Sequence, residues 1–84
     1  MEDIKKRFAN VLVDTLDIPQ EQIHSDARFK EDLNVDSLDM MELILALEKE
    51  FNIQIPDEAI EEIKTIGNAE KHISTTLSNR TISG

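Results

Sequence analysis

The sequence contains no cysteine, no tryptophan and no tyrosine, and only three phenylalanines among its 84 residues. Without cysteine there is no disulfide framework, no thiolate metal site and no cysteine nucleophile, so any thiol chemistry must come from a group added to the chain. The scarcity of aromatic residues leaves leucine, isoleucine, valine and methionine to fill the interior. These absences predict a small core built mainly from aliphatic side chains.

Positive charge and long hydrophobic runs are also scarce. Nine basic residues face 18 acidic ones, for a formal charge of -9, which repels nucleic acid and anionic lipid and favours basic protein surfaces as partners. No apolar stretch approaches the length needed to span a bilayer, so we expect a soluble, cytoplasmic protein without stable membrane insertion. A chain of this length forms one small domain with little room for an enzyme cleft.

The spacing of apolar residues predicts an all-α fold, a small four-helix bundle with three longer helices, one short third helix and a long first loop. The loop, residues 18–35, carries Ile23, Phe29 and Leu33 as anchors to the core. We expect one domain over residues 1–77, followed by a polar, frayed C-terminal tail at 78–84. The expected helices span residues 2–16, 36–51, 57–63 and 65–77.

The expected second helix has two apolar faces. One is an ordinary core face, formed by Met40, Leu43, Ile44, Leu47 and Phe51. Leu38, Met41 and Leu45 lie on another face, beside Glu42 and Glu48. This second stripe either docks a partner through its apolar centre and acidic rim, or is covered by the loop or the short third helix, or consists of scattered surface side chains without a role.

Ser37 lies in the first turn of this helix, after Asp36, which is suited to cap it. There is no GxSxG motif, and His24 and His72 lie in unrelated segments, so self-contained serine catalysis is not expected. The position suits a phosphoester, because a helix N-terminus favours negative charge, although serine there is often only a cap. The spacing of histidines and acidic residues predicts no metal site.

The segment DLNVDSLDMMELILALEKEFNIQIPDE, residues 32–58, resembles the centre of acyl carrier proteins of type II (dissociated) fatty acid synthesis. The resemblance extends from about Ile4 to Leu77. It implies that a carrier protein synthase attaches 4'-phosphopantetheine from coenzyme A covalently to Ser37. It further implies a monomer, not an enzyme, that carries growing acyl chains as thioesters and presents them to fatty acid synthesis enzymes with basic docking surfaces.

The same resemblance assigns roles to individual residues. Asp36 is expected to contact the synthase, and Asp39 to join an acidic rim. The recognition face is expected to comprise Leu38, Met41, Glu42, Leu45 and Glu48. The core that shelters an acyl chain is expected to include Phe29, Leu47 and Phe51.

The chain departs from the family pattern at a few positions. Asn34 and Val35 stand where glycine and a small or apolar residue are usual, but asparagine tolerates the left-handed turn. Lys49 replaces a frequent acidic residue, and Glu70 and His72, at positions often apolar and tyrosine, are expected on the surface. Two alternatives stay open: a specialised carrier of D-alanyl, aminoacyl or polyketide groups, and an unmodified acidic helical adaptor.

Overall fold

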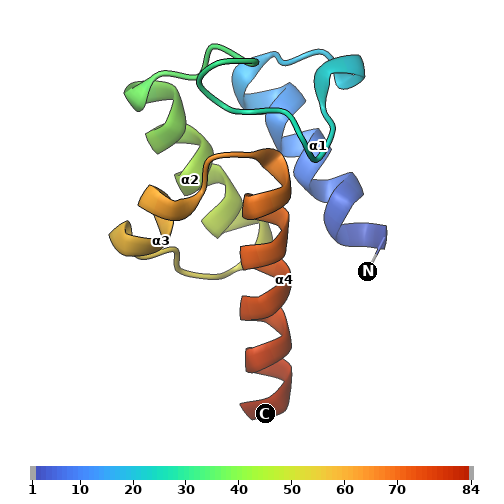
Figure 1. Cartoon of the computed structure of the whole chain (residues 1–84). Helices are drawn as coiled ribbons and strands as arrows, with labels where there is room; N and C mark the ends of the chain where they lie inside the picture. Colours follow the sequence, from blue (N-terminus) through green and yellow to red (C-terminus); the bar gives the residue numbers. More distant parts are fainter. Residues whose placement is uncertain (1, 84) are drawn as a thin grey trace.

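The computed structural model describes residues 2–83, with side chains from Ile4 to Ser78. The order of elements is α1 (Glu2–Leu16), the 3-10 turn η1 (Gln20–Gln22), α2 (Ser37–Phe51), α3 (Asp57–Glu62) and α4 (Ile66–Ser83). Figure 1 shows a small helical bundle in which the segment between α1 and α2 crosses one end. The predicted fold class, an all-α bundle with a short third helix, is confirmed.

The core joins α1, α2 and α4 through large aliphatic and aromatic side chains. The largest side chains that are almost completely buried are Phe8, Leu12, Leu43, Leu47, Ile66 and Ile73. The predicted core face of α2 is confirmed, with Met40 partly buried and the other four residues buried. Burial of such side chains is the main favourable contribution to folding of a domain this small.

A polar clamp reinforces the contact between α1 and α2. The Arg7 guanidinium donates to the Glu50 carboxylate at 2.8 Å and to the Glu50 carbonyl oxygen. It also lies 4.5 Å from the centre of the Phe51 ring, within the range of a cation–π contact. One side chain of α1 therefore contacts the last turn of α2 in three ways.

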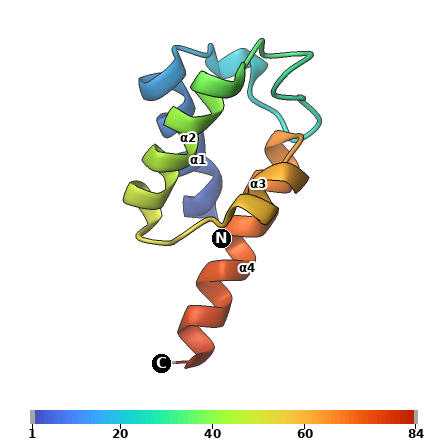
Figure 2. The same cartoon turned by 90° about the vertical axis from the view of Figure 1, so that its left-hand side faces the viewer.

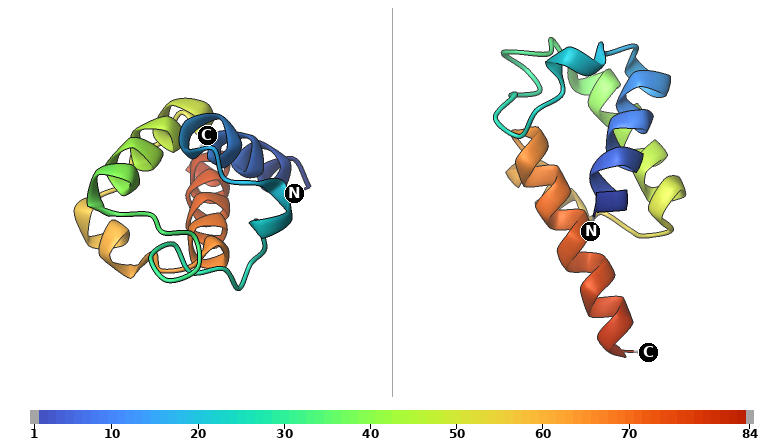
Figure 3. Two further views of the ribbon diagram at one scale, coloured as in Figure 1. Left: turned by 90° about the horizontal axis from the view of Figure 1, so that it is seen from above. Right: turned by 90° about the vertical axis from the view of Figure 1, so that its right-hand side faces the viewer.

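The long first loop is ordered by a few anchors and by backbone pairing with the start of α4. Phe29 is buried, as predicted, and Ile23 and Leu33 are partly buried. Phe29 N–H donates to the Lys64 carbonyl at 3.1 Å, and Ile66 N–H donates to the Ala27 carbonyl at 3.0 Å. This pairing fixes the loop against the segment that connects α3 to α4 (Figure 3).

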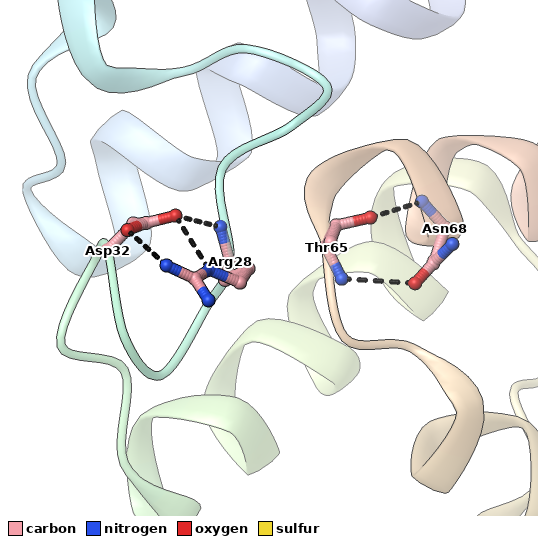
Figure 4. Close-up of polar contacts among 4 residues, drawn as sticks. All are labelled: Arg28, Asp32, Thr65 and Asn68. Atoms are coloured by element: carbon pink, nitrogen blue, oxygen red, sulfur yellow. Dashed lines mark hydrogen bonds and ion pairs between the residues drawn. The ribbon is translucent and has the colours of Figure 1, made fainter.

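Two local hydrogen-bond clusters stabilise these joined segments (Figure 4). Asp32 accepts from the backbone N–H and the side chain of Arg28, and this hydrogen-bonded guanidinium lowers the pKa of the Asp32 carboxyl below its ordinary value. At the start of α4, Thr65 Oγ1 accepts from Asn68 N–H at 3.1 Å, and Asn68 Oδ1 accepts from Thr65 N–H at 3.2 Å. This reciprocal pair resembles a capping box.

The last helix is longer than the helix predicted from the sequence, which ended at residue 77 and was followed by a tail. Helix α4 continues to Ser83, beyond the other helices (Figure 2). The side chains of 79–83 and the whole of Gly84 lie outside the described part of the structure. Fraying of this segment stays a prediction.

Candidate functional site

The site is built around the first turn of α2. Asn34 has a φ of 58°, the left-handed conformation expected for it, and Val35 is buried and donates to the Phe29 carbonyl at 2.7 Å. Asp36 then caps the helix, accepting from Asp39 N–H at 2.8 Å. The predicted cap is confirmed, and it makes Ser37 the first helical residue.

Ser37 is exposed at this position. The first N–H groups of an α-helix lack intrahelical partners, and the aligned peptide dipoles give this end a partial positive charge. An added phosphate at Ser37 would therefore lie in a favourable field, which partly offsets repulsion from the Asp36 and Asp39 carboxylates. An accessible hydroxyl at a helix N-terminus fits a phosphodiester-linked group.

The second apolar stripe of α2 is uncovered. Leu38 is 77% exposed, and Met41 and Leu45 are each 61% exposed. Neither the long loop nor α3 buries these side chains, so the interpretation in which the stripe is covered is wrong. Exposed apolar side chains grouped on one helix face are typical of an interaction surface.

The acidic residues around this stripe differ in their surroundings. Glu42 is exposed, whereas Asp39 and Glu48 are partly buried. The Glu48 carboxylate accepts from the backbone N–H of Ile55 at 2.8 Å, across the connector between α2 and α3. Lys49, beside it, is exposed. The carboxylates around the stripe therefore differ in exposure and in hydrogen bonding.

A hollow of about 220 Å³ lies close to the start of α2, between this helix, α3 and the loop. Its apolar lining comes from Phe29, Val35, Met40, Ile60 and Ile63. Of the three residues predicted to shelter an acyl chain, Phe29 lines the hollow, while Leu47 and Phe51 are buried elsewhere in the core. The sequence interpretation missed Ile60 and Ile63, although their spacing of three residues placed them on one side of the short helix.

The expectation that Glu70 and His72 lie on the surface is met only in part, because both side chains are partly buried. Burial raises the pKa of the Glu70 carboxyl, and the nearby Lys5 ammonium opposes that shift. The Nε2 atom of His72 is buried and has no hydrogen-bond partner among the described residues. Both side chains lie on α4, so neither belongs to the first turn of α2.

The residues described by the structure contain no group of three or more histidine, cysteine or acidic side chains arranged to hold a metal ion. His24 is exposed in the loop, and His72 lies on α4. Neither histidine is on the helix that carries Ser37.

Comparison with known proteins matches residues 6–73 to the family described as "Phosphopantetheine attachment site". The class of protein is thus one that bears a covalent 4'-phosphopantetheine group, in agreement with an accessible serine at a helix N-terminus. A protein of Phenylobacterium zucineum (strain HLK1), named "Acyl carrier protein", is 43% identical over 77 residues, which cover 92% of this chain and 98% of that protein. The chain belongs to the acyl carrier protein family.

Proposed function

We propose that Ser37 is the attachment point of the 4'-phosphopantetheine group, and that the protein carries growing fatty acyl chains in type II fatty acid synthesis. The observation that supports this most directly is the exposed hydroxyl of Ser37 at the N-terminus of α2, next to an uncovered apolar stripe. When bound, the group supplies the thiol that this cysteine-free chain lacks, and the thiol holds an acyl group as a thioester. The chain itself supplies the tether, the docking surface and a shelter.

The docking surface is proposed to comprise Leu38, Met41 and Leu45 at its centre, with Asp36, Asp39, Glu42 and Glu48 around it. The apolar side chains contribute affinity when a partner removes them from water, and the carboxylates orient a basic partner. Because Asp36 directly precedes Ser37, it is placed to meet the carrier protein synthase. The same surface then serves fatty acid synthesis enzymes with basic docking surfaces.

The hollow beside Met40 is proposed to shelter the acyl chain. Its apolar lining and its position near the start of α2 support this role. A chain held there is shielded from water and from nucleophiles until a partner docks. Buried Leu47 and Phe51 support the hollow through the core and are not its walls.

We further propose that the protein acts as a cytoplasmic monomer and catalyses no reaction itself. Ser37 has no histidine on its own helix to serve as a base. In the part of the chain covered by the structure, no helix combines the length and apolar character required to cross a membrane. Membership of the acyl carrier protein family argues against an adaptor that works without a prosthetic group.

The attachment site is tested by incubating the purified chain with coenzyme A and a carrier protein synthase and measuring intact mass. Wild type should gain the mass of one phosphopantetheine group, and Ser37→Ala should gain none, because the acceptor oxygen is gone. Ser74→Ala, which removes an exposed hydroxyl from α4, is the matched control and should be modified fully. Modification of a folded Ser37→Ala variant contradicts the assignment.

The cargo is tested separately by mass spectrometry of the protein isolated from its native cells. Fatty acyl groups of several lengths on the arm support the proposed pathway. A single D-alanyl, aminoacyl or polyketide group would instead identify the specialised carrier that the attachment motif also permits.

A further inference from the structure

Glu48 accepts hydrogen bonds from the connector between α2 and α3, residues 52–56, through both its backbone carbonyl and its side-chain carboxylate. Its carbonyl oxygen accepts from Asn52 N–H and, at 3.1 Å, from Ile53 N–H as α2 ends. Its carboxylate accepts from Ile55 N–H at 2.8 Å. Glu42, on the same helix, is exposed. The two glutamates, which share the recognition face in the sequence interpretation, therefore have different surroundings.

The connector leads directly into α3 and determines where this helix begins. Ile53 and Ile55 are 7% and 6% exposed, so they fasten the connector to the core. Pro56 follows as the N-cap residue of α3 and supplies no side-chain cap. The hydrogen bond from Ile55 N–H to the Glu48 carboxylate therefore lies two residues before the first residue of α3.

Helix α3 depends on such attachments because it cannot stand alone. It has six residues, far fewer than an isolated helix needs to persist in water. Within it, Ala59 and Ile60 are partly buried, and the four acidic residues are exposed. At its far end, the pairing of Lys64 with Phe29 ties the chain to the long loop. The helix is therefore held by attachments at its two ends and by the packing of Ala59 and Ile60 against the core.

This helix forms one wall of the hollow beside Met40, through Ile60 and the residue that follows its end, Ile63. A shift of α3 would open that wall without disturbing the buried pairing of α1 with α2. The position of α3 consequently controls how well the hollow encloses its contents.

We propose that Glu48 is a positioning residue that latches α3 over the hollow through Ile55 N–H. This inference deepens the proposed function, since it rests on the hollow sheltering an acyl chain. Loss of the carboxylate acceptor loosens the entry to α3 and exposes the sheltered thioester. The role needs an acceptor oxygen at this position and does not need negative charge.

The first experiment measures amide hydrogen exchange by NMR in Glu48→Ala, Glu48→Gln and the matched control Glu42→Ala. Exchange at the Ile55 amide should become at least about tenfold faster in Glu48→Ala. A hydrogen bond to a charged acceptor contributes enough stability to slow exchange by at least about that factor. Glu48→Gln keeps an acceptor oxygen and should restore most of the protection. Equal exchange in wild type and Glu48→Ala, or equal loss in the alanine and glutamine variants, overturns the proposal.

In the second experiment, the carrier protein synthase transfers an octanoyl- or acetyl-phosphopantetheine arm from the corresponding coenzyme A thioester to the Ser37 hydroxyl of each variant, with release of adenosine 3',5'-bisphosphate. Cleavage of the thioester by hydroxylamine is then followed. Octanoyl cleavage should be several-fold faster in Glu48→Ala than in wild type, while acetyl cleavage, with little chain to shelter, stays the same. Glu48→Gln should resemble wild type, and so should Glu21→Ala, which removes an exposed carboxylate outside the proposed docking surface. An unchanged rate of octanoyl cleavage in Glu48→Ala contradicts the proposal that Glu48 holds α3 over the hollow.

These measurements separate failure of the latch from failure of the proposed function. If no variant accepts an arm, Ser37 is not the tether, and exchange at Ile55 still decides whether Glu48 holds the connector. Should Glu48→Ala fail to fold, the amide signal of Ile55 in Glu48→Gln tests whether Ile55 N–H donates to the side chain at position 48. Replacing a carboxylate by an amide acceptor shifts that signal selectively, and an unmoved signal overturns the proposal.

Discussion

The paired helices α1 and α2 are packed more firmly than α3. The firm pair carries Ser37 and the exposed apolar stripe, whereas α3 forms a wall of the hollow. Four of the almost completely buried large side chains, Phe8, Leu12, Leu43 and Leu47, come from α1 and α2. Helix α3 has six residues and none that is buried. The firmly packed pair presents Ser37 and the exposed stripe, whereas the lightly attached helix covers the hollow. For the proposed function this division is useful, because a docking surface should stay fixed and a wall that shelters an acyl chain should be able to move.

The largest expected effect compares a core residue of α2 with a residue of α3. Leu47→Ala should lower the free energy of unfolding by about 2–5 kcal/mol, since it leaves a cavity in a packed interior. Ile60→Ala, at a partly buried position, should cost about 1–2 kcal/mol. Urea denaturation followed by circular dichroism measures both. Similar losses for the two variants would mean that α3 is as firmly integrated as α2.

The next effect concerns the clamp between α1 and α2. Arg7→Ala should cost about 1–2 kcal/mol of unfolding free energy, because it removes an exposed ion pair, a hydrogen bond to a carbonyl and a cation–π contact. Glu50→Gln, which keeps the carbonyl and the ring contact, should cost less. High salt should weaken only the ion-pair part. If Glu50→Gln is as damaging as Arg7→Ala, the ion pair alone carries the clamp.

These contrasts show which features the sequence predicts well. The bounds of α1 and α2 follow from apolar periodicity, and the cap at Asp36 follows from the preference of short polar side chains for helix starts. The exposed stripe could be placed on its face, but whether anything covered it depended on the path of the loop. That path is set by pairing between Phe29 and Lys64, residues far apart in the sequence.

Other features depend on tertiary packing that no local pattern records. The hydrogen bond between Glu48 and Ile55 requires the connector to fold back beside α2. The partial burial of Glu70 and His72 depends on what lies against α4, which the sequence of α4 alone does not show. The lining of the hollow by Ile60 and Ile63 likewise requires the position of α3, which periodicity over six residues cannot supply.

A smaller effect tests whether the start of α2 belongs to the firm part of the molecule. Asp36→Ala should lose about 1 kcal/mol of unfolding free energy, because Asp39 N–H loses its acceptor. Asp36→Asn keeps the cap, so its stability should match wild type. The proposed contact between Asp36 and the synthase predicts that modification of Ser37 slows in Asp36→Asn, because the carboxylate charge is lost. A normal rate of modification in Asp36→Asn would mean that Asp36 caps α2 and that its charge does not contribute to docking.

The smallest expected effect lies on α4, where burial raises the pKa of Glu70 above its unfolded value. A raised pKa means that the folded protein binds this proton more tightly, so the contribution of Glu70 to stability is complete below the unfolded pKa. It is lost as pH rises through the folded pKa, and at neutral pH the charged group is slightly unfavourable. Glu70→Gln should therefore stabilise the protein at pH 7 by less than about 0.5 kcal/mol, given partial exposure and screening. The gain should shrink at pH values below the unfolded pKa, where wild-type Glu70 is also neutral. Urea denaturation of both proteins across this range measures the difference, and a loss of stability at pH 7 would show that attraction by Lys5 outweighs burial.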